Sequence, residues 1–521
     1  MQRSLYMLCR HICNKKTNLS VIKIEAPIMK HIQGFDRNQE ILFPPKIDDY
    51  IEEDNIVRFI EAFVAILDLA LLGFTHAELK PTGRAPYNPA DLLKLYLYGY
   101  LNKIRSSRNL EREAHRNIEV MWLMKKLAPD HKTIADFRKN NSKPIKKVFK
   151  EFVSFCKKLN LYGAETVGID GSKFKAVNSK DRNFNHDNLV KKLKNIEEKT
   201  EAYLKELDEN DTHEEDEENG LSVIQPDAKE LKEKIEQLEQ RKSKYQDLLN
   251  KLETTGENQI SLTDPDSRMM LGNQKFDVCY NVQTTIDDKY NLIVDYSVTN
   301  DTNDMKQLDT MSRRAKEILE VESLNALADK GYYNPEEIKK CVDNNIIPYI
   351  PEPKSKQPKE GEIPTAGFCD CDFEYDASRD VYTCPKSCEL TFSKMYKKND
   401  KVMRGYRSDG CINCESKSKC TRKKKGRVLL RWEHEGVLDD MRERAGKNKD
   451  MMKKRKCMCE HPFGTMKRGF NQGYLLLKGM TKVGGEMGLT MLAYNMRRVI
   501  NILGVAELMD FLKSGDGSAQ I

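Results

Sequence analysis

The sequence contains no apolar run that approaches the length of a bilayer-spanning helix, which needs about 20 residues. Its apolar fraction is 39%, so we expect a soluble protein without a membrane partner. The first 28 residues hold scattered charges and lack the apolar core of a signal peptide. Because nothing indicates export, the expected location is the cytoplasm.

A strong excess of one charge is also missing. Lys and Arg number 88 against 81 Asp and Glu, a difference too small to indicate a partner by itself. The distribution is more informative, because basic residues gather between 395 and 431 and acidic residues between 208 and 218. Such uneven charge favours a polyanionic partner for part of the surface, although a solvated basic face explains it equally well.

The 521 residues allow about two to four domains, and the first of these is predicted to be helical. From 47 to about 163 the apolar spacing indicates helices throughout, one of them strongly apolar and starting at Pro89. Two short basic helices at 106–117 and 131–140 flank an apolar stretch, which resembles a helix-turn-helix arrangement. A plain helical bundle explains the pattern equally well. The basic residues expected to reach a DNA groove are Arg105, Arg108, Arg112, Arg116 and Arg138.

Downstream, strand and helix patterns alternate. Predicted strands lie at 165–177, 276–287, 290–300, 323–331 and 346–351. A tight turn at Asp288 and Lys289 joins the second and third strands, and predicted helices lie at 304–319, from Pro335 onward and at 449–512. This order predicts an α/β layout with a mixed sheet.

A long interruption at 181–264 separates the first two strands. It contains two helices with heptad-like apolar spacing, joined by the acidic stretch. The pattern predicts an antiparallel helical hairpin, which we interpret as an arm or a dimerisation element without chemistry of its own.

Three acidic residues stand where a carboxylate is hard to explain structurally. Asp170 lies within an apolar strand, Asp329 ends a strand, and Glu460 lies in a predicted helix. A charge at a buried strand is costly unless it is paired or bound to a metal. Three converging carboxylates would form a hard oxygen site for Mg²⁺, suited to phosphodiester chemistry. Each acid taken singly is explained more simply as a capping or salt-bridged residue.

The segments around these acids carry a family resemblance. IDGSKFKA around Asp170, ADKGYYNPEEI around Asp329 and EHPFGTMKR around Glu460 resemble the three motifs of DDE transposases of bacterial insertion sequences. YNVQTTID, VTNDTND and LKGMTKVGGEMGLTMLAYNMRR are similar to family segments in the same order, so the resemblance spans residues 29 to about 500.

The resemblance implies a ribonuclease-H-like core with Asp170 and Asp329 on adjacent central strands and Glu460 on a following helix. It implies cleavage of transposon-end DNA and joining to target DNA, for which we expect two Mg²⁺ (or Mn²⁺) ions. We expect a nucleoid-associated protein that forms a homodimer in the synaptic complex, because two transposon ends must be brought together. The family places a Tyr and an Arg before the Glu and a Lys seven positions after it. Lys467 fits the last position, where it would contact DNA phosphate.

The basic position before Glu460 departs from the family pattern. Lys453 and Lys456 stand where the Tyr and the Arg are expected, and Arg455 is the candidate DNA contact if the motif shifts by one residue. We interpret His461 as a packing or hydrogen-bonding residue rather than a general base.

Seven of the 14 cysteines lie between Cys369 and Cys420. Clustered cysteines in a cytoplasmic protein indicate metal before disulfide. Similar transposases carry cysteines at positions like Cys384, Cys411, Cys414 and Cys420, which makes these the candidate Zn²⁺ ligands. The additional cysteines Cys388, Cys369 and Cys371 leave the fourth ligand open. Reduced structural cysteines without a metal are the alternative. The basic residues that follow, and that we expect to face DNA, are Arg422, Lys423 and Lys424.

These features predict an α/β protein with a ribonuclease-H-like mixed-sheet core, an all-α DNA-binding domain and two insertions. The expected boundaries are 1–45 for an extension and lead-in, 46–163 for the helical domain, 164–351 and 449–512 for the core, 181–264 for the hairpin and 352–448 for the cysteine-rich basic insertion. We expect translation from Met29 to give a functional protein. Two alternatives stay open: an inactive, transposase-derived DNA-binding protein, and a ribonuclease-H-like nuclease of DNA repair.

Overall fold

The computed structural model describes residues 46–79, 85–214, 228–272, 275–353, 368, 370–398, 400–421 and 423–514. Met29, Cys369 and Arg422 lie outside these described residues. The chain divides into residues 1–50, where one 3₁₀ turn at Ile47–Tyr50 is described, and residues 51–521, to which all other elements belong. Within the described ranges, no helix has both the length and the apolar character to cross a membrane.

The N-terminal region is helical, with loops between the helices, throughout its described residues, as predicted. Its helices are α1 (Ile56–Ala65), α2 (Leu69–Leu72), α3 (Pro89–Leu101), α4 (Ser107–Arg116), α5 (Ile118–Leu123), α6 (His131–Asn140) and α7 (Ser142–Lys158). Pro89 occupies the first turn of α3, and the Asn88 side chain caps it by accepting from the Ala90 amide. Nearly every residue of α3 is buried, so this helix is the centre of the region.

The last helix of the chain, α15 (Met480–Lys513), packs against α1, α3 and α7 as well as against the sheet. Phe155 of α7 contacts Phe511 edge to face, and the Arg497 guanidinium donates to the Leu101 carbonyl. The N-terminal helices and α15 therefore share one apolar core. The helical region depends on the C-terminal helix for part of its stability.

The central sheet mixes antiparallel and parallel pairs. Its strands are β1 (Thr166–Lys175), β4 (Arg268–Gly272), β5 (Lys275–Asp287), β6 (Ile293–Thr299), β7 (Leu324–Leu327) and β8 (Ile346–Tyr349). The order is β4-β5-β1-β7-β8, with β6 also paired to β5. β5 is antiparallel to β1, β4 and β6, whereas β1, β7 and β8 are mutually parallel. The prediction of a mixed sheet is confirmed.

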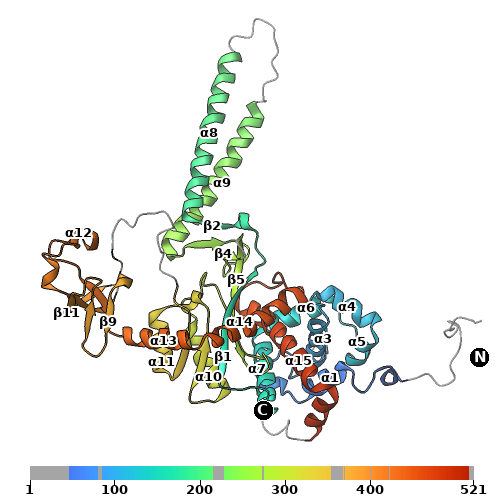
Figure 1. Cartoon of the computed structure of the whole chain (residues 1–521). Helices are drawn as coiled ribbons and strands as arrows, with labels where there is room; N and C mark the ends of the chain where they lie inside the picture. The colour runs from blue at the N-terminus through green and yellow to red at the C-terminus, as the bar shows by residue number, and fades with distance from the viewer. Residues whose placement is uncertain are drawn as a thin grey trace, which may run out of the picture. The chain divides into compact units, whose positions relative to one another are not determined.

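Helices cover both faces of this sheet (Figure 1). On one face α10 (Leu308–Leu319) packs beneath β1, and α11 (Pro335–Asp343) packs on α10 and β8. On the other face α14 (Lys449–Gly464) packs on β1, β5 and β7. The strand β1 thus lies between these two helical layers.

The predicted two-residue turn at Asp288 and Lys289 is wrong. β6 begins only at Ile293, and Asn291 adopts a positive φ of 54°. The reason lies in Asp287, whose carboxylate accepts from the amides of Gly163, Ala164 and Lys289. These bonds draw the strand end toward β1, so a longer loop makes the connection.

The interruption between β1 and β5 contains two long helices, α8 (His186–Glu214) and α9 (Ala228–Thr255), which run side by side (Figure 1). At their base the short strands β2 (Asn183–Asn185) and β3 (Gln259–Ser261) pair antiparallel. Phe184, Leu189 and Leu252 form a small separate core there.

The cysteine-rich segment forms an antiparallel sheet of its own, in the order β13-β12-β11-β10-β9. Its elements are β9 (Glu374–Asp376), β10 (Val381–Thr383), β11 (Glu389–Lys398), β12 (Lys401–Arg407), α12 (Lys417–Cys420) and β13 (Leu429–Trp432). The next helix, α13 (Glu435–Lys447), packs on α11 and β8, with Leu438 and Met441 in the same apolar cluster as Ile338. The range 352–448 drawn from the sequence therefore includes a helix that packs on the core.

Candidate active site

Asp170 lies within β1, and Asp329 follows the neighbouring strand β7. β1 and β7 pair in parallel through residues 166–168 and 325–327, and both acids follow the last paired residues by two positions. Because the two strands run parallel and both acids lie two residues beyond their last pair, their carboxylates converge. A guanidinium nitrogen of Arg455, on α14, lies 3.3 Å from Asp170 Oδ1 and 3.9 Å from Asp329 Oδ2. One cationic group therefore contacts both carboxylates.

Burial and charge act in opposite directions on Asp170. Burial raises the pKa of this carboxyl to about 6; the Arg455 guanidinium opposes the rise and the Asp329 carboxylate adds to it. The Gly171 amide donates to Asp170 Oδ1 at 3.0 Å. Asp329 is more exposed, and its Oδ1 accepts from the Gly331 amide at 2.8 Å, which caps the turn Lys330–Tyr332.

A glycine lets α14 approach β1 closely. A Cβ at Gly168 would lie 2.7 Å from Cys459 Sγ, so the strand can meet the helix only without a side chain there. Arg455 and Cys459 are one helical turn apart and share the face directed at β1. Asp170 lies on the same face of the strand as Gly168, because side chains alternate along a strand.

Glu460 does not join the other two acids. Its side chain is exposed, and within the described part of the chain it makes no hydrogen bond or ion pair. Among the described residues, no group of three or more His, Cys, Asp or Glu side chains is arranged to hold a metal ion. The structure thus brings together Asp170, Asp329 and Arg455. Glu460 follows Cys459, whose side chain faces β1, and so it lies on a different side of α14.

Two other residues near Glu460 have defined contacts. The Lys467 amine donates to Ser172 Oγ at 2.6 Å and to the Lys173 carbonyl at 3.0 Å, beside the strand of Asp170. His461 Nδ1 lies 2.9 Å from the Tyr494 hydroxyl, so its interpretation as a hydrogen-bonding residue is confirmed. At the two positions where the family pattern calls for Tyr and Arg, Lys453 pairs with Asp450, and Lys456 is exposed.

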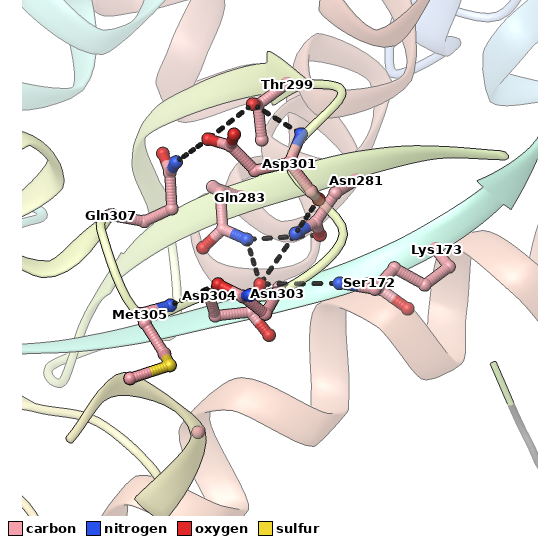
Figure 2. Close-up of polar contacts among 12 residues, drawn as sticks. Ser172, Lys173, Asn281, Gln283, Thr299, Asp301, Asn303, Asp304, Met305 and Gln307 are labelled. Carbon is pink, nitrogen blue, oxygen red and sulfur yellow. Dashed lines mark hydrogen bonds and ion pairs between the residues drawn. The ribbon is translucent and has the colours of Figure 1, made fainter. Parts of the chain in front are cut away.

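Sequence reasoning missed a third acid close to Asp170. Asp304 lies in the loop between β6 and α10, and its Oδ1 accepts hydrogen bonds from Asn281 and Gln283 of β5 (Figure 2). The repeated Asp residues in VTNDTND, directly after a buried strand, were the available signal. That signal could not be separated from an ordinary Asp-rich turn without the strand pairing.

The basic residues of the helical region fall into two groups. Arg105 and Arg138 are wrong as DNA contacts, because both are buried. Arg105 donates to the Tyr474 carbonyl and lies 3.9 Å from the buried Glu486 carboxylate, and Arg138 donates to the Tyr100 hydroxyl. The exposed group comprises Arg108, Arg112 and Arg116, all on α4. Arg116 pairs with Glu113, and Arg112 lies 3.4 Å from the Asn109 side-chain oxygen.

Five cysteines line one small cavity of about 50 Å³ in the cysteine-rich sheet region: Cys384, Cys388, Cys411, Cys414 and Cys420. The amides of Lys386 and Cys388 both donate to Cys384 Sγ at 3.3 Å. Lys423 and Lys424 follow this cluster and are exposed.

Comparison with known proteins gave two matches. Residues 45–140 match the family model described as Transposase domain (DUF772), and residues 383–500 match the one described as Transposase DDE domain. The second match contains Arg455, Glu460 and Lys467. No curated protein and no solved structure matches the chain.

Proposed function

We propose that this DDE-type transposase of an insertion sequence binds the terminal inverted repeats of its element through the N-terminal helices and cuts and joins DNA with Asp170, Asp329 and Glu460. The chain is a metal-dependent enzyme that cleaves DNA and transfers strands. The family match implies a ribonuclease-H-like core, with which the mixed sheet is consistent. The observation that carries the proposal is the convergence of Asp170 and Asp329 on one cationic group.

The two carboxylates suit a hard divalent cation. Both offer oxygen donors, and both already face the same positive charge, so a cation held between them would compete with Arg455 for the same oxygens. Two bound Mg²⁺ or Mn²⁺ ions would activate the attacking water or 3′-hydroxyl and stabilise the leaving oxygen. Glu460 would complete the ligand set from α14.

The protein's own cationic groups would then act on the DNA. Lys467 reaches the face of β1 that carries Asp170, where an amine can pair with a phosphate next to the scissile bond. Arg455, once a cation had displaced it from the carboxylates, would be free to contact the phosphate backbone of the same DNA. Lys423 and Lys424 would hold DNA farther from the site. Transposon-end and target DNA are the proposed partners, bound by a homodimer because two ends must be brought together.

End recognition is assigned to α4. Arg108→Ala and Arg112→Ala should each weaken binding of the full-length protein to end DNA by about tenfold. Each should also lower the slope of log K against log salt concentration by about one, the change expected for the loss of one phosphate contact. Lys150→Ala, an exposed basic residue of α7, is the matched control. The full chain is used because α15 completes the core of the helical region. Gel shifts with end DNA and scrambled DNA measure both affinities, and unchanged binding by both Arg variants would refute the assignment.

A structural zinc ion is proposed for Cys384, Cys411, Cys414 and Cys420. The protein purified without chelators should contain about one zinc per chain by elemental analysis. Cys384→Ser should lower the zinc content close to zero, while Cys457→Ser, an exposed cysteine of α14, should leave it unchanged. Folded wild-type protein without zinc would contradict the proposal. If Cys388→Ser abolishes zinc binding and Cys414→Ser does not, the fourth ligand is Cys388.

A further inference from the structure

A polar network lies on the face of the sheet opposite α14. Asp304 Oδ1 accepts from Asn281 Nδ2 at 2.7 Å and from Gln283 Nε2 at 2.6 Å, and it lies 3.5 Å from Lys173 Nζ (Figure 2). Asn281 and Gln283 are fully buried on β5. Three donors thus converge on one carboxylate oxygen, and none of them belongs to the loop that carries Asp304.

This carboxylate sits directly over the backbone beside Asp170. A Cβ at Gly171 would lie 2.7 Å from Asp304 Oδ1 and 2.3 Å from Gln283 Nε2. A side chain at the glycine of the IDGS motif would therefore displace the Asp304 carboxylate and the Gln283 amide from their present positions. Gln283 is the direct partner of Gly171 in the pairing of β1 with β5. The network consequently fixes the segment of β1 from which Asp170 projects.

The same glutamine also reaches the second acid's turn. Gln283 Oε1 accepts a hydrogen bond from the Tyr332 hydroxyl. Tyr332 is fully buried and ends the 3₁₀ turn that Asp329 caps. One side chain of β5 therefore contacts the strand of Asp170, the turn of Asp329 and the Asp304 carboxylate.

We propose that Gln283 and Asp304 are positioning residues that hold Asp170 and Asp329 at the separation a divalent cation requires. The inference rests on the proposed function, since it assumes that these two acids bind the cation. Groups that orient metal ligands from behind are needed for affinity, and their loss typically weakens metal binding by about 10- to 100-fold. The network touches neither the DNA-binding helices nor the face of α14, so its effect is confined to the carboxylate pair.

Binding of Mn²⁺ to the full-length protein, after EDTA treatment and buffer exchange, tests this directly by calorimetry. Asp304→Ala should weaken Mn²⁺ binding by about 10- to 100-fold while leaving the affinity for end DNA in EDTA unchanged. Tyr332→Phe keeps the buried ring and removes one hydrogen bond, so it should fold and weaken Mn²⁺ binding by about three- to tenfold. Asp301→Asn is the matched control from the same loop, because that side chain bonds Thr299 and Gln307. It should bind Mn²⁺ like the wild type.

The outcomes separate the two hypotheses. If Asp170→Asn binds Mn²⁺ as well as the wild type, the proposed metal site itself is wrong. If Asp170→Asn loses binding while both Asp304→Ala and Tyr332→Phe retain full affinity, the metal site stands and the positioning role is overturned. Equal losses in Asp304→Ala and Asp301→Asn would also overturn it, because they would indicate a general effect of the loop. Should Asp304→Ala fail to fold, Tyr332→Phe decides.

Discussion

Asp170→Asn and Asp329→Asn should each reduce Mg²⁺-dependent cleavage of end DNA on the order of 10³-fold or more. Asparagine keeps the shape of each side chain but removes the negative charge that would attract the cation. Binding to end DNA should survive, because it is assigned to α4 and not to the strands that carry these two acids. Each variant needs two assays, an end-DNA shift and a cleavage reaction. Asp343→Asn, an exposed acid at the end of α11, serves as the control.

The same Asp170 variant has a pH-dependent effect on stability. Burial raises the pKa of Asp170 to about 6, above its value of about 3.9 in an unfolded chain. The native state therefore holds a proton that the unfolded state loses between about pH 4 and 6, and wild-type stability falls across this window and stays lower above it. In EDTA, Asp170→Asn should match the wild type near pH 4 and exceed it above pH 6, by up to about 3 kcal/mol.

Thermal unfolding at pH 4, 5, 6 and 7 measures this difference. A gain in stability that does not depend on pH would contradict the account, since it would separate the effect from ionisation of Asp170.

If either Asp170→Asn or Asp329→Asn lost DNA binding and cleavage together, the damage would be to folding and the cleavage result could not be assigned to metal binding. Near wild-type cleavage by either variant would remove that residue from the site.

Local sequence signals predicted most of the elements that carry the site. The strand around Asp170 was predicted at 165–177 and is found at Thr166–Lys175, and the helix starting at Pro335 begins there. These predictions held because alternation, proline position and capping act over a few residues. Asp170 also stood out within its apolar strand before any pairing was known, since a charge in that setting needs a partner.

What the sequence could not supply was non-local pairing. Gln283 and Tyr332 are 49 residues apart, and nothing in either segment indicates that they bond. Arg105 looked like a DNA contact on a short basic helix, yet Glu486, near the other end of the chain, draws it into the interior. The sheet in the cysteine-rich segment was not predicted, because β9 and β10 have three residues each and the longer strand β11 is mostly polar and exposed.

Glu460 presents the sharpest contrast between the family pattern and the structure. It follows Cys459, which packs at Gly168, and successive helix residues are separated by about 100° around the axis. Its carboxylate therefore points away from the line of Arg455 and Cys459. The helix contains Pro462, and a π-helical turn at Thr465–Gly469 follows it. Prolines and π-helical turns are where helices bend, and the proposed role of Glu460 as a third ligand requires such a change at this end of α14.

Glu460→Gln should accordingly lower cleavage and strand transfer on the order of 10³-fold, with end-DNA binding intact. Because Glu460 is exposed and makes no described polar contact, the substitution should leave the unfolding temperature unchanged, unlike Asp170→Asn. Asp450→Asn, an exposed acid in the first turn of the same helix, controls for loss of charge on α14. Calorimetry with Mn²⁺ should find weaker binding in Glu460→Gln and none of this loss in the control. If Glu460→Gln cuts end DNA at the wild-type rate, Glu460 is not the third ligand.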